Sequence, residues 1–168
     1  MINEILADPN PVVGMPDAEF VELFNASDSV FYNLQDWIFV NTTSAKILPS
    51  FVLGPGEYVV LCDANNVALF SNVGNVMGIP SFTALTNTGD SLTLLFSDST
   101  LVDMVSYTDD WFTTSLAAGG GVSLELVNPY STCVGALGWL QSESAVGGTP
   151  GGVNSVLNTA PDIYSPQL

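Results

Sequence analysis

Short runs of apolar residues recur along the chain, and each run is bounded by glycine, proline, asparagine or aspartate. The runs are rich in Val, Ile, Leu, Phe and Tyr, which favour extended backbone, whereas the bounding residues favour turns. The pattern predicts strands at residues 2–6, 19–25, 36–41, 47–51, 57–63, 91–97, 101–107 and 122–127. Short strands at this spacing are typical of an all-β antiparallel sandwich.

Alternation within the strand at 122–127 predicts which of its side chains are buried. Val122, Leu124 and Leu126 share one face, and Ser123 and Glu125 share the other. Because successive side chains of a strand point to opposite sides, this pattern predicts a half-buried strand.

Glu22 lies in the middle of an apolar strand, on the same face as Phe20 and Phe24. Such a carboxyl group lies at the rim of the sheet, or is hydrogen-bonded, or is partly desolvated with a raised pKa. Of these environments, we expect the rim.

The remaining segments are less regular. We expect one short helix at residues 64–70, with Asp63 as its N-cap, and a long loop at residues 72–80. The glycine-rich stretch at 147–152 predicts the end of the fold, and the proline-containing stretch after it is typical of a linker. We therefore expect one sandwich domain at residues 1–157 and an inter-domain linker or tail at residues 158–168.

Charge excludes several classes of function. The chain has one Lys (Lys46), no Arg and no His against 17 acidic residues, which gives a formal net charge of -16. Nucleic acids, anionic membranes and phosphorylated ligands are bound largely through Lys and Arg, so we expect none of them as partners. No apolar run is long enough for membrane insertion.

The same composition argues against catalysis. Without His, neither a Ser-His-Asp triad nor a histidine-containing zinc site can form, and two cysteines are too few for an all-cysteine zinc site. A carboxylate-pair hydrolase is formally possible, but we expect a protein that is not an enzyme and has no catalytic residues and no cofactor.

Several segments in fixed order carry a family resemblance. They include INEIL at 2–6, EFVELFN at 19–25, LQDW at 34–37, LGPGEYVVL at 53–61, LTNTGDSL at 85–92, VDMVSY at 102–107, SLEL at 123–126, Trp139 and GTPGGVNS at 148–155. Their order and spacing resemble the bacterial lamin-tail domain, an Ig-like β-sandwich family, over residues 2 to about 156. The resemblance implies a folding signature that contains no catalytic motif.

The resemblance also implies a context. Bacterial domains of this kind are modules of large multidomain proteins, so we expect a non-catalytic structural or adhesive module, located extracellularly or at the cell surface. Its partners would be neighbouring domains of the same chain or other surface proteins. The alternative is a carbohydrate-binding or substrate-targeting domain of a secreted enzyme, in which Tyr32, Trp111 and Phe112 would stack on a glycan.

Two further constellations are candidate sites. Cys62 and Cys133 are the only cysteines, and in an extracellular chain they suggest a disulfide, although two separate buried thiols are the alternative. Oxygen-rich loops offer weak calcium candidates at Asp8, Asp17, Glu19, Asp109 and Asp110. Their spacing does not match an EF-hand, and solvated carboxylates are the simpler interpretation.

Overall fold

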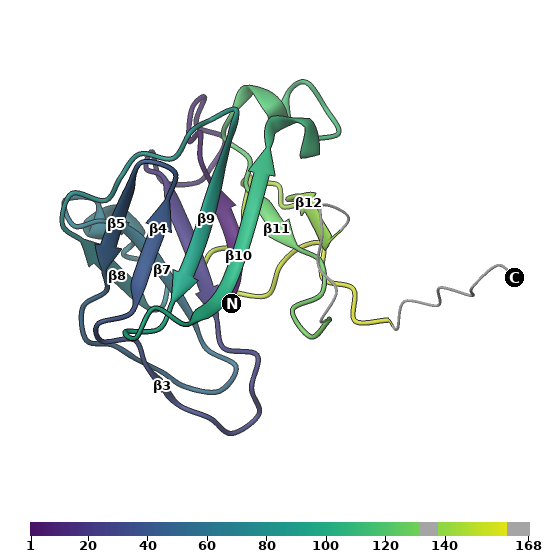
Figure 1. Ribbon diagram of the computed structural model, residues 1–168. Helices are drawn as coiled ribbons and strands as arrows, with labels where there is room; N and C mark the ends of the chain where they lie inside the picture. The colour runs from purple at the N-terminus through teal and green to yellow at the C-terminus, as the bar shows by residue number, and fades with distance from the viewer. Residues whose placement is uncertain (132–137, 161–168) are drawn as a thin grey trace, which may run out of the picture.

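The computed structural model describes residues 1–131 and 138–160, and it confirms an all-β sandwich. A six-stranded sheet has the order β12-β11-β1-β2-β7-β8, a four-stranded sheet has the order β10-β9-β4-β5, and β3 pairs with β6. In Figure 1 the four-stranded sheet lies in front of β1, β2 and β7. All pairings are antiparallel except that of β7 with β8.

The strands are short. They are β1 (Ile2–Leu6), β2 (Phe20–Phe24), β3 (Tyr32–Asn33), β4 (Ile38–Asn41), β5 (Ser44–Ile47), β6 (Val52–Leu53), β7 (Tyr58–Asp63), β8 (Val76–Ile79), β9 (Gly89–Leu95), β10 (Leu101–Thr108), β11 (Leu124–Leu126) and β12 (Trp139–Gln141). The described residues also form the 3-10 helices η1 (Val67–Phe70), η2 (Asp109–Trp111) and η3 (Ala117–Gly119). No helix in the described part of the chain has the length and apolar character needed to span a membrane.

The main core lies between the two large sheets. Ile5, Val21 and Leu61 face it from the six-stranded sheet, and Phe39 and Leu92 face it from the four-stranded sheet. Each of these side chains is at most 2% exposed. Because buried aliphatic area is the dominant favourable contribution to folding, this layer holds the two sheets together.

A second, smaller apolar cluster covers the outer face of the six-stranded sheet. Leu6, Phe20 and Cys62 project from β1, β2 and β7, and Phe70 of η1 packs on them edge-to-face with Phe20 at 5.8 Å. All residues of β1 and β2 are buried as a result. These two strands are therefore covered on both sides.

Several sequence predictions of local structure were wrong. The strand predicted at 47–51 is replaced by β5 and β6, because Pro49 supplies no backbone donor. β5 instead follows β4 through a tight turn in which the Asn41 side chain accepts hydrogen bonds from the backbone of Thr43 and Ser44. The loop predicted at 72–80 contains β8. Its Gly78 leaves space for η1, since a Cβ there would lie 2.6 Å from Val67 Cγ2.

The helix predicted at 64–70 is shorter than expected. Only η1, a single 3-10 turn, forms there, and Asp63 is not its N-cap. The Asp63 carboxylate instead accepts a hydrogen bond from Asn65 N at 2.9 Å, which closes a local turn directly after β7.

The strand at 122–127 is also not half-buried. Leu124, Glu125 and Leu126 of β11 are all buried, and Ser123 is buried beside them. Residues 148–156 return across the outer face of the six-stranded sheet and cover these polar side chains, as the bonds from Thr149 and Ser155 to Glu125 show. The glycine-rich stretch at 147–152 therefore covers the sheet rather than ending the fold.

Gly148 gives a direct test of this arrangement. A Cβ at position 148 would lie 2.7 Å from Glu4 Oε1 and 3.0 Å from Ser123 Oγ. We predict that Gly148→Ala lowers the free energy of unfolding by about 1–3 kcal/mol, the usual cost of overpacking a tight site. Urea unfolding followed by tryptophan fluorescence measures it.

Gly74→Ala is the matched control, because no atom lies within 4 Å of a Cβ built at Gly74. Its free energy of unfolding is expected to stay within about 1 kcal/mol of the wild-type value. Equal effects of the two substitutions would contradict the close approach of the 148–156 segment to the sheet.

Candidate functional site

Three glutamates lie in one row across three neighbouring strands of the six-stranded sheet. Glu4 of β1 is in register with Glu125 of β11 on one side and with Glu22 of β2 on the other. Directly opposed residues of an antiparallel pair place their side chains on the same face, about 4.5–5.5 Å apart at Cβ. Each of the three side chains is 0% exposed. We call this set the carboxyl row.

A β-bulge brings an amide into the row. The register between β1 and β2 shifts between Ile2 and Glu4, so Asn3 is the extra residue of the bulge. The Asn3 side chain donates to Glu22 Oε1 at 2.9 Å and to Asn154 Oδ1 at 2.8 Å. The bulge therefore gives Glu22 a hydrogen-bond donor that regular pairing of β1 with β2 would not place there.

Residues 148–156 supply most of the other donors. Glu4 Oε1 accepts from Thr149 N at 2.9 Å, and Glu22 Oε2 accepts from Gly151 N. Glu125 accepts from Thr149 Oγ1 at 2.9 Å and from Ser155 Oγ at 2.8 Å. One short segment thus binds all three carboxyl groups, with both backbone and hydroxyl donors.

Asn154 fixes the far end of the same segment. Its side-chain amide donates to Leu126 O at 2.8 Å and to Asn3 O at 3.1 Å, and its carbonyl accepts from Asn3. Ser123, which directly precedes β11, also donates a hydrogen bond to Glu4 Oε1 at 2.6 Å. No buried polar side-chain atom of the described residues lacks a partner.

No Lys or Arg side chain lies beside the carboxyl row. Lys46, the only Lys or Arg of the chain, lies in β5 of the opposite sheet. Burial raises the pKa of Glu4 to about 7, against the opposing effect of hydrogen bonds from Ser123 and Thr149. Burial, together with the nearby Glu4 carboxyl, raises the pKa of Glu22 to about 8. With no basic side chain beside them, the buried Glu4 and Glu22 carboxyl groups favour the protonated form.

The rim position expected for Glu22 was therefore wrong. Glu22 is completely buried and hydrogen-bonded, because the 148–156 segment covers it from a distant part of the sequence. Glu4, Asn3 and Asn154 were not among the functional residues predicted from the sequence. A signal was present, since Glu4, Glu22 and Glu125 each lie within an apolar strand segment.

The chemistry available to the row is limited by these contacts. Its carboxyl oxygens accept hydrogen bonds from groups of the protein, and its side chains are closed off from solvent. In residues 1–131 and 138–160, no group of three acidic, histidine or cysteine side chains is arranged to hold a metal ion. The hydrogen bonds of the carboxyl row therefore hold residues 148–156 on the outer face of the six-stranded sheet.

The calcium candidates Asp8, Asp17 and Glu19 accept hydrogen bonds from groups of the protein, and Asn10 donates to both Asp8 and Asp17. Asp8 accepts from Asn87 Nδ2 at 2.7 Å, Asp17 accepts from Asn10 Nδ2 at 2.7 Å, and Glu19 accepts from Leu85 N at 2.9 Å. Asp109 and Asp110 belong to η2. Calcium binding at these residues stays a prediction.

The predicted disulfide is not tested by the structure. Cys62 is fully buried in the outer cluster, where burial raises the pKa of its thiol to about 11. Cys133 lies outside the described residues. The pairing of the two cysteines remains a prediction.

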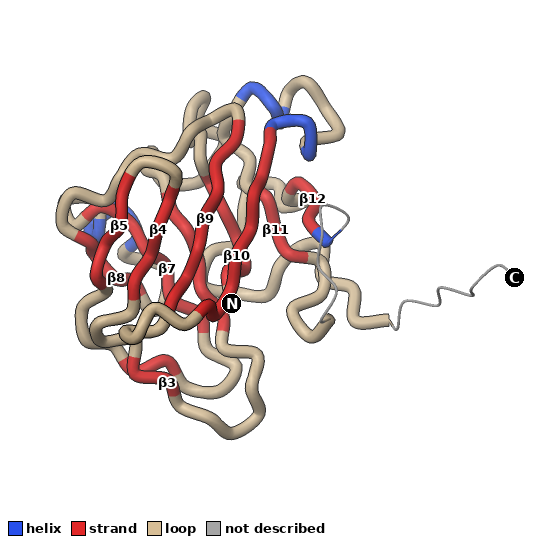
Figure 2. Tube along the Cα trace, viewed as in Figure 1, coloured by secondary structure: helices blue, strands red, loops and turns tan. Residues whose placement is uncertain are grey.

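The three candidate glycan-binding rings do not lie together. Tyr32 belongs to β3, whereas Trp111 belongs to η2 and Phe112 follows it, and Figure 2 places β3 and η2 at opposite ends of the sandwich. Trp111 and Phe112 are half-buried against the core, with Trp111 6.5 Å from the ring of Trp139. A single stacking platform from these three rings is not formed, and glycan binding stays a prediction.

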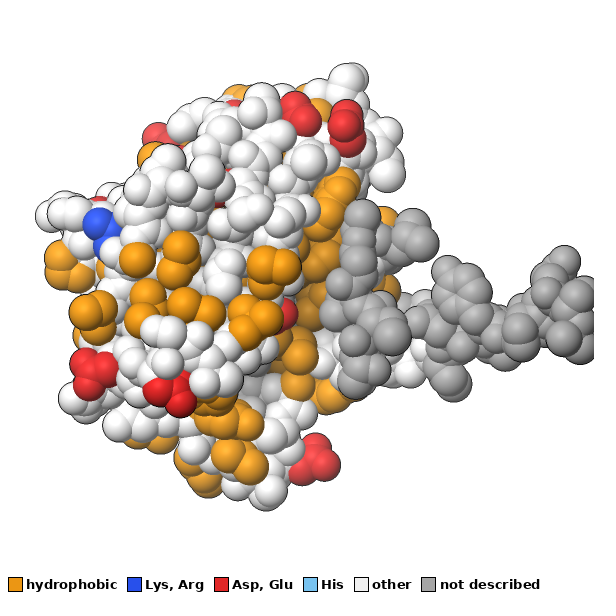
Figure 3. Space-filling model, in the orientation of Figure 1, with side chains coloured by type: hydrophobic (Ala, Val, Ile, Leu, Met, Phe, Trp, Pro, Cys, Tyr) orange, Lys and Arg blue, Asp and Glu red, His pale blue; other side chains and the backbone are white. Residues whose placement is uncertain are grey.

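The outer face of the four-stranded sheet carries an apolar row that the sequence analysis did not identify. Leu101, Leu95, Ile38 and Ile47 are neighbours in register, one from each strand. Leu101 is 57% exposed and Ile47 is 68% exposed, and Met104 beside them is 60% exposed. Figure 3 shows apolar side chains gathered on this face. Contiguous exposed apolar groups of this kind mark interaction surfaces.

The carboxyl row makes stability depend on pH with a defined sign. The folded-state pKa of Glu22 is about 8 and that of Glu4 is about 7, both above the ordinary value of 4.5. Folding therefore favours protonation, and the stabilising contribution is lost progressively as the pH rises from about 4.5 to about 8. We predict that the free energy of unfolding falls between pH 6 and 8.5, on the order of a few kcal/mol.

Glu22→Gln should flatten this dependence, because position 22 then carries no charge at any pH. Exposed Glu143→Gln is the control and should leave the slope unchanged. Urea titrations at intervals of half a pH unit measure the slope, and Glu4→Gln serves if the first variant does not fold. A wild-type stability that rises from pH 6 to 8.5 would contradict protonation of the row.

Comparison with known proteins agrees with this architecture. A search of curated proteins gives no match to the chain. A family model described as the Lamin Tail Domain matches residues 1–109, a stretch that includes Glu4 and Glu22 and ends before Glu125. Since the match covers more than half of the 168 residues and the structure is an Ig-like β-sandwich, the chain belongs to the Lamin Tail Domain family.

Proposed function

We propose that this chain is a non-catalytic structural or adhesive module of a larger secreted or cell-surface bacterial protein. The observation that carries the proposal is the apolar row on the outer face of the four-stranded sheet, formed by Leu101, Leu95, Ile38 and Ile47. The row is uncharged in a chain whose formal net charge is -16. Another protein, even an acidic one, can therefore contact the row without charge repulsion from carboxylates within it.

The state of the acidic residues supports a non-catalytic role. General acid–base chemistry requires a carboxyl group within hydrogen-bond reach of a substrate. The carboxyl groups with strongly raised pKa, Glu4 and Glu22, are instead engaged by backbone and side-chain donors beneath residues 148–156. With no His in the chain, the commonest alternative general base is missing.

The charge of the surface supports the choice of partner. A chain with one Lys and no Arg has no basic patch with which to bind nucleic acid or anionic lipid. Its contacts are therefore with neighbouring domains of the same chain or with other surface proteins. This part of the proposal rests on the sequence, the apolar row and the family membership together.

Surface location and contact are tested in one experiment on intact cells that make the parent protein. A photo-crosslinking amino acid replaces Ile47, and irradiation is followed by external protease treatment. We expect crosslinks to a neighbouring domain or another surface protein, and loss of the domain to the protease. Leu116, which is 79% exposed and outside the apolar row, is the control position and should give few crosslinks.

A protein that resists external protease until the cells are lysed would contradict surface location. Equal crosslinking from positions 47 and 116 would contradict a specific contact through the apolar row. A cytoplasmic marker that stays intact during the protease treatment shows that the cells remained closed.

A further inference from the structure

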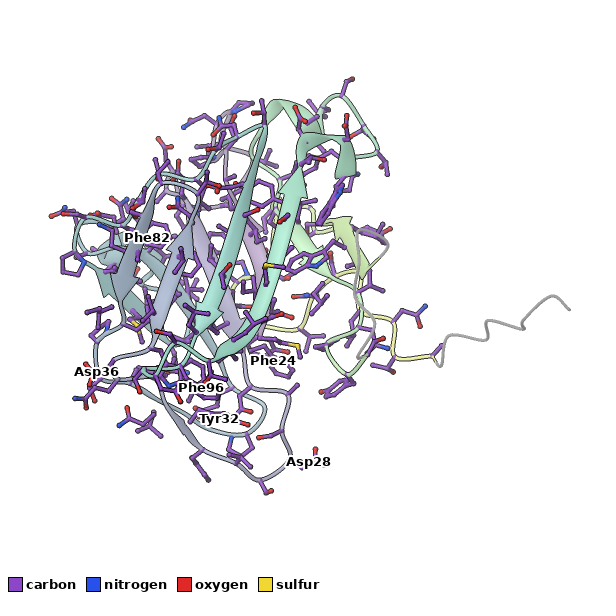
Figure 4. All side chains as sticks on the ribbon, viewed as in Figure 1. Phe24, Asp28, Tyr32, Asp36, Phe82 and Phe96 are labelled. Atoms are coloured by element: carbon purple, nitrogen blue, oxygen red, sulfur yellow. The ribbon has the colours of Figure 1, made fainter. Side chains whose placement is uncertain are left out.

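One end of the sandwich holds an aromatic pocket that is separate from the carboxyl row. Its volume is about 230 Å³, and its wall includes Phe24, Tyr32, Trp37 and Phe96. Figure 4 shows Phe24, Tyr32 and Phe96 near one another at the end of the sandwich where β3 lies. A cavity of about 150 Å³ already holds benzene, so the pocket has room for a compact organic group.

The rings meet at steep angles. Tyr32 lies 5.9 Å from Trp37 with an interplanar angle of 68°, and Phe96 lies 4.6 Å from Trp37 with an interplanar angle of 70°. Tyr32 and Phe96 thus both pack edge-to-face with Trp37 in the wall of the pocket. A cation within about 6 Å of several ring centroids is attracted by each of their faces.

The Asn25 and Ser27 side chains of the wall are already engaged. The Asn25 amide donates to Val30 O at 2.8 Å and to Leu53 O at 3.1 Å, and its carbonyl oxygen accepts from the backbone N and Oγ of Ser27. These two side chains are therefore not free to bind the hydroxyl groups of a ligand. The wall favours a ligand that needs ring faces rather than hydrogen bonds.

Negative charge flanks the pocket. Asp28 follows the wall residue Ser27, and Asp36 precedes the wall residue Trp37; both are exposed. Figure 4 shows Asp28 and Asp36 on either side of Tyr32 and Phe96. Met1 also lines the wall, and its amino group donates a hydrogen bond to Phe24 O at 2.9 Å. The carboxylates of Asp28 and Asp36 favour a cation in this part of the molecule.

We propose that this pocket binds a small molecule that carries a trimethylammonium group. Such a group carries a positive charge, which the rings and the flanking carboxylates attract. Its surface is apolar and it donates no N–H hydrogen bonds, so it needs no polar partner in the wall of the pocket. The rings of the pocket wall provide cation–π contacts, and Asp28 and Asp36 provide long-range attraction.

A matched pair of probes tests the proposal. Choline and 3,3-dimethylbutan-1-ol have the same shape, but a neutral carbon replaces the charged nitrogen in the second. Titration of the 168-residue protein is followed by NMR, using the ring signals of Tyr32, Trp37 and Phe96. We expect saturable choline binding centred on these rings, and binding of the neutral analogue that is at least about 10-fold weaker.

Two pairs of variants separate the rings from the charges. Phe96→Leu should weaken choline binding at least about 3-fold, whereas Phe82→Leu should not, since Phe82 stacks on Phe39 outside the pocket. The double variant Asp28→Asn with Asp36→Asn should weaken binding at low salt. Asp109→Asn with Asp110→Asn removes equal charge in η2 and should have a smaller effect.

The proposal has clear contrary outcomes. Equal affinity for choline and the neutral analogue would show an apolar pocket without selection for charge, and would overturn it. An absence of saturable shifts at Tyr32, Trp37 and Phe96 would overturn it as well. The aspartate variants keep the test decisive if Phe96→Leu does not fold, because Asp28 and Asp36 are exposed.

Discussion

Burial of three carboxyl groups without a cation is the constraint on which the rest of this structure depends. Glu4, Glu22 and Glu125 are side by side in three strands, and their donors come largely from residues 148–156. Strands β1 and β2 are buried on both faces only because this segment and the outer apolar cluster cover them. The domain is thus closed by a segment that lies beyond the 1–109 match to the family.

The same shortage of basic residues shapes the surface. Ion pairs cannot neutralise 17 acidic residues with one Lys, so buried acids are protonated or hydrogen-bonded and the others face solvent. The apolar row of the four-stranded sheet and the aromatic pocket at the β3 end are both formed without carboxyl side chains. We propose contact with another protein through the apolar row because its side chains are exposed and uncharged. We propose cation binding in the pocket because aromatic rings line it.

The sequence predicted the fold class and most strands, because alternation and turn residues are local signals. β1, β2, β7 and β10 lie at or within two residues of the expected positions. β8 and the burial of Glu22 and Glu125 could not be predicted in this way, since each depends on a segment distant in sequence: η1 packs over Gly78, and residues 148–156 cover the glutamates. The aromatic pocket likewise joins residues from β2, β3 and the end of β9, whose proximity only the tertiary structure establishes.

Direct titration of the carboxyl row tests the central claim most sharply. Carbon-detected NMR of the glutamate side-chain carboxyl signals, recorded from pH 3 to 10, follows Glu4 and Glu22 individually. The account predicts titration midpoints near 7 for Glu4 and near 8 for Glu22, far above the ordinary value of 4.5. Midpoints below about 5 for both groups in the folded protein would contradict it, because Glu4 and Glu22 would then both be ionised at neutral pH.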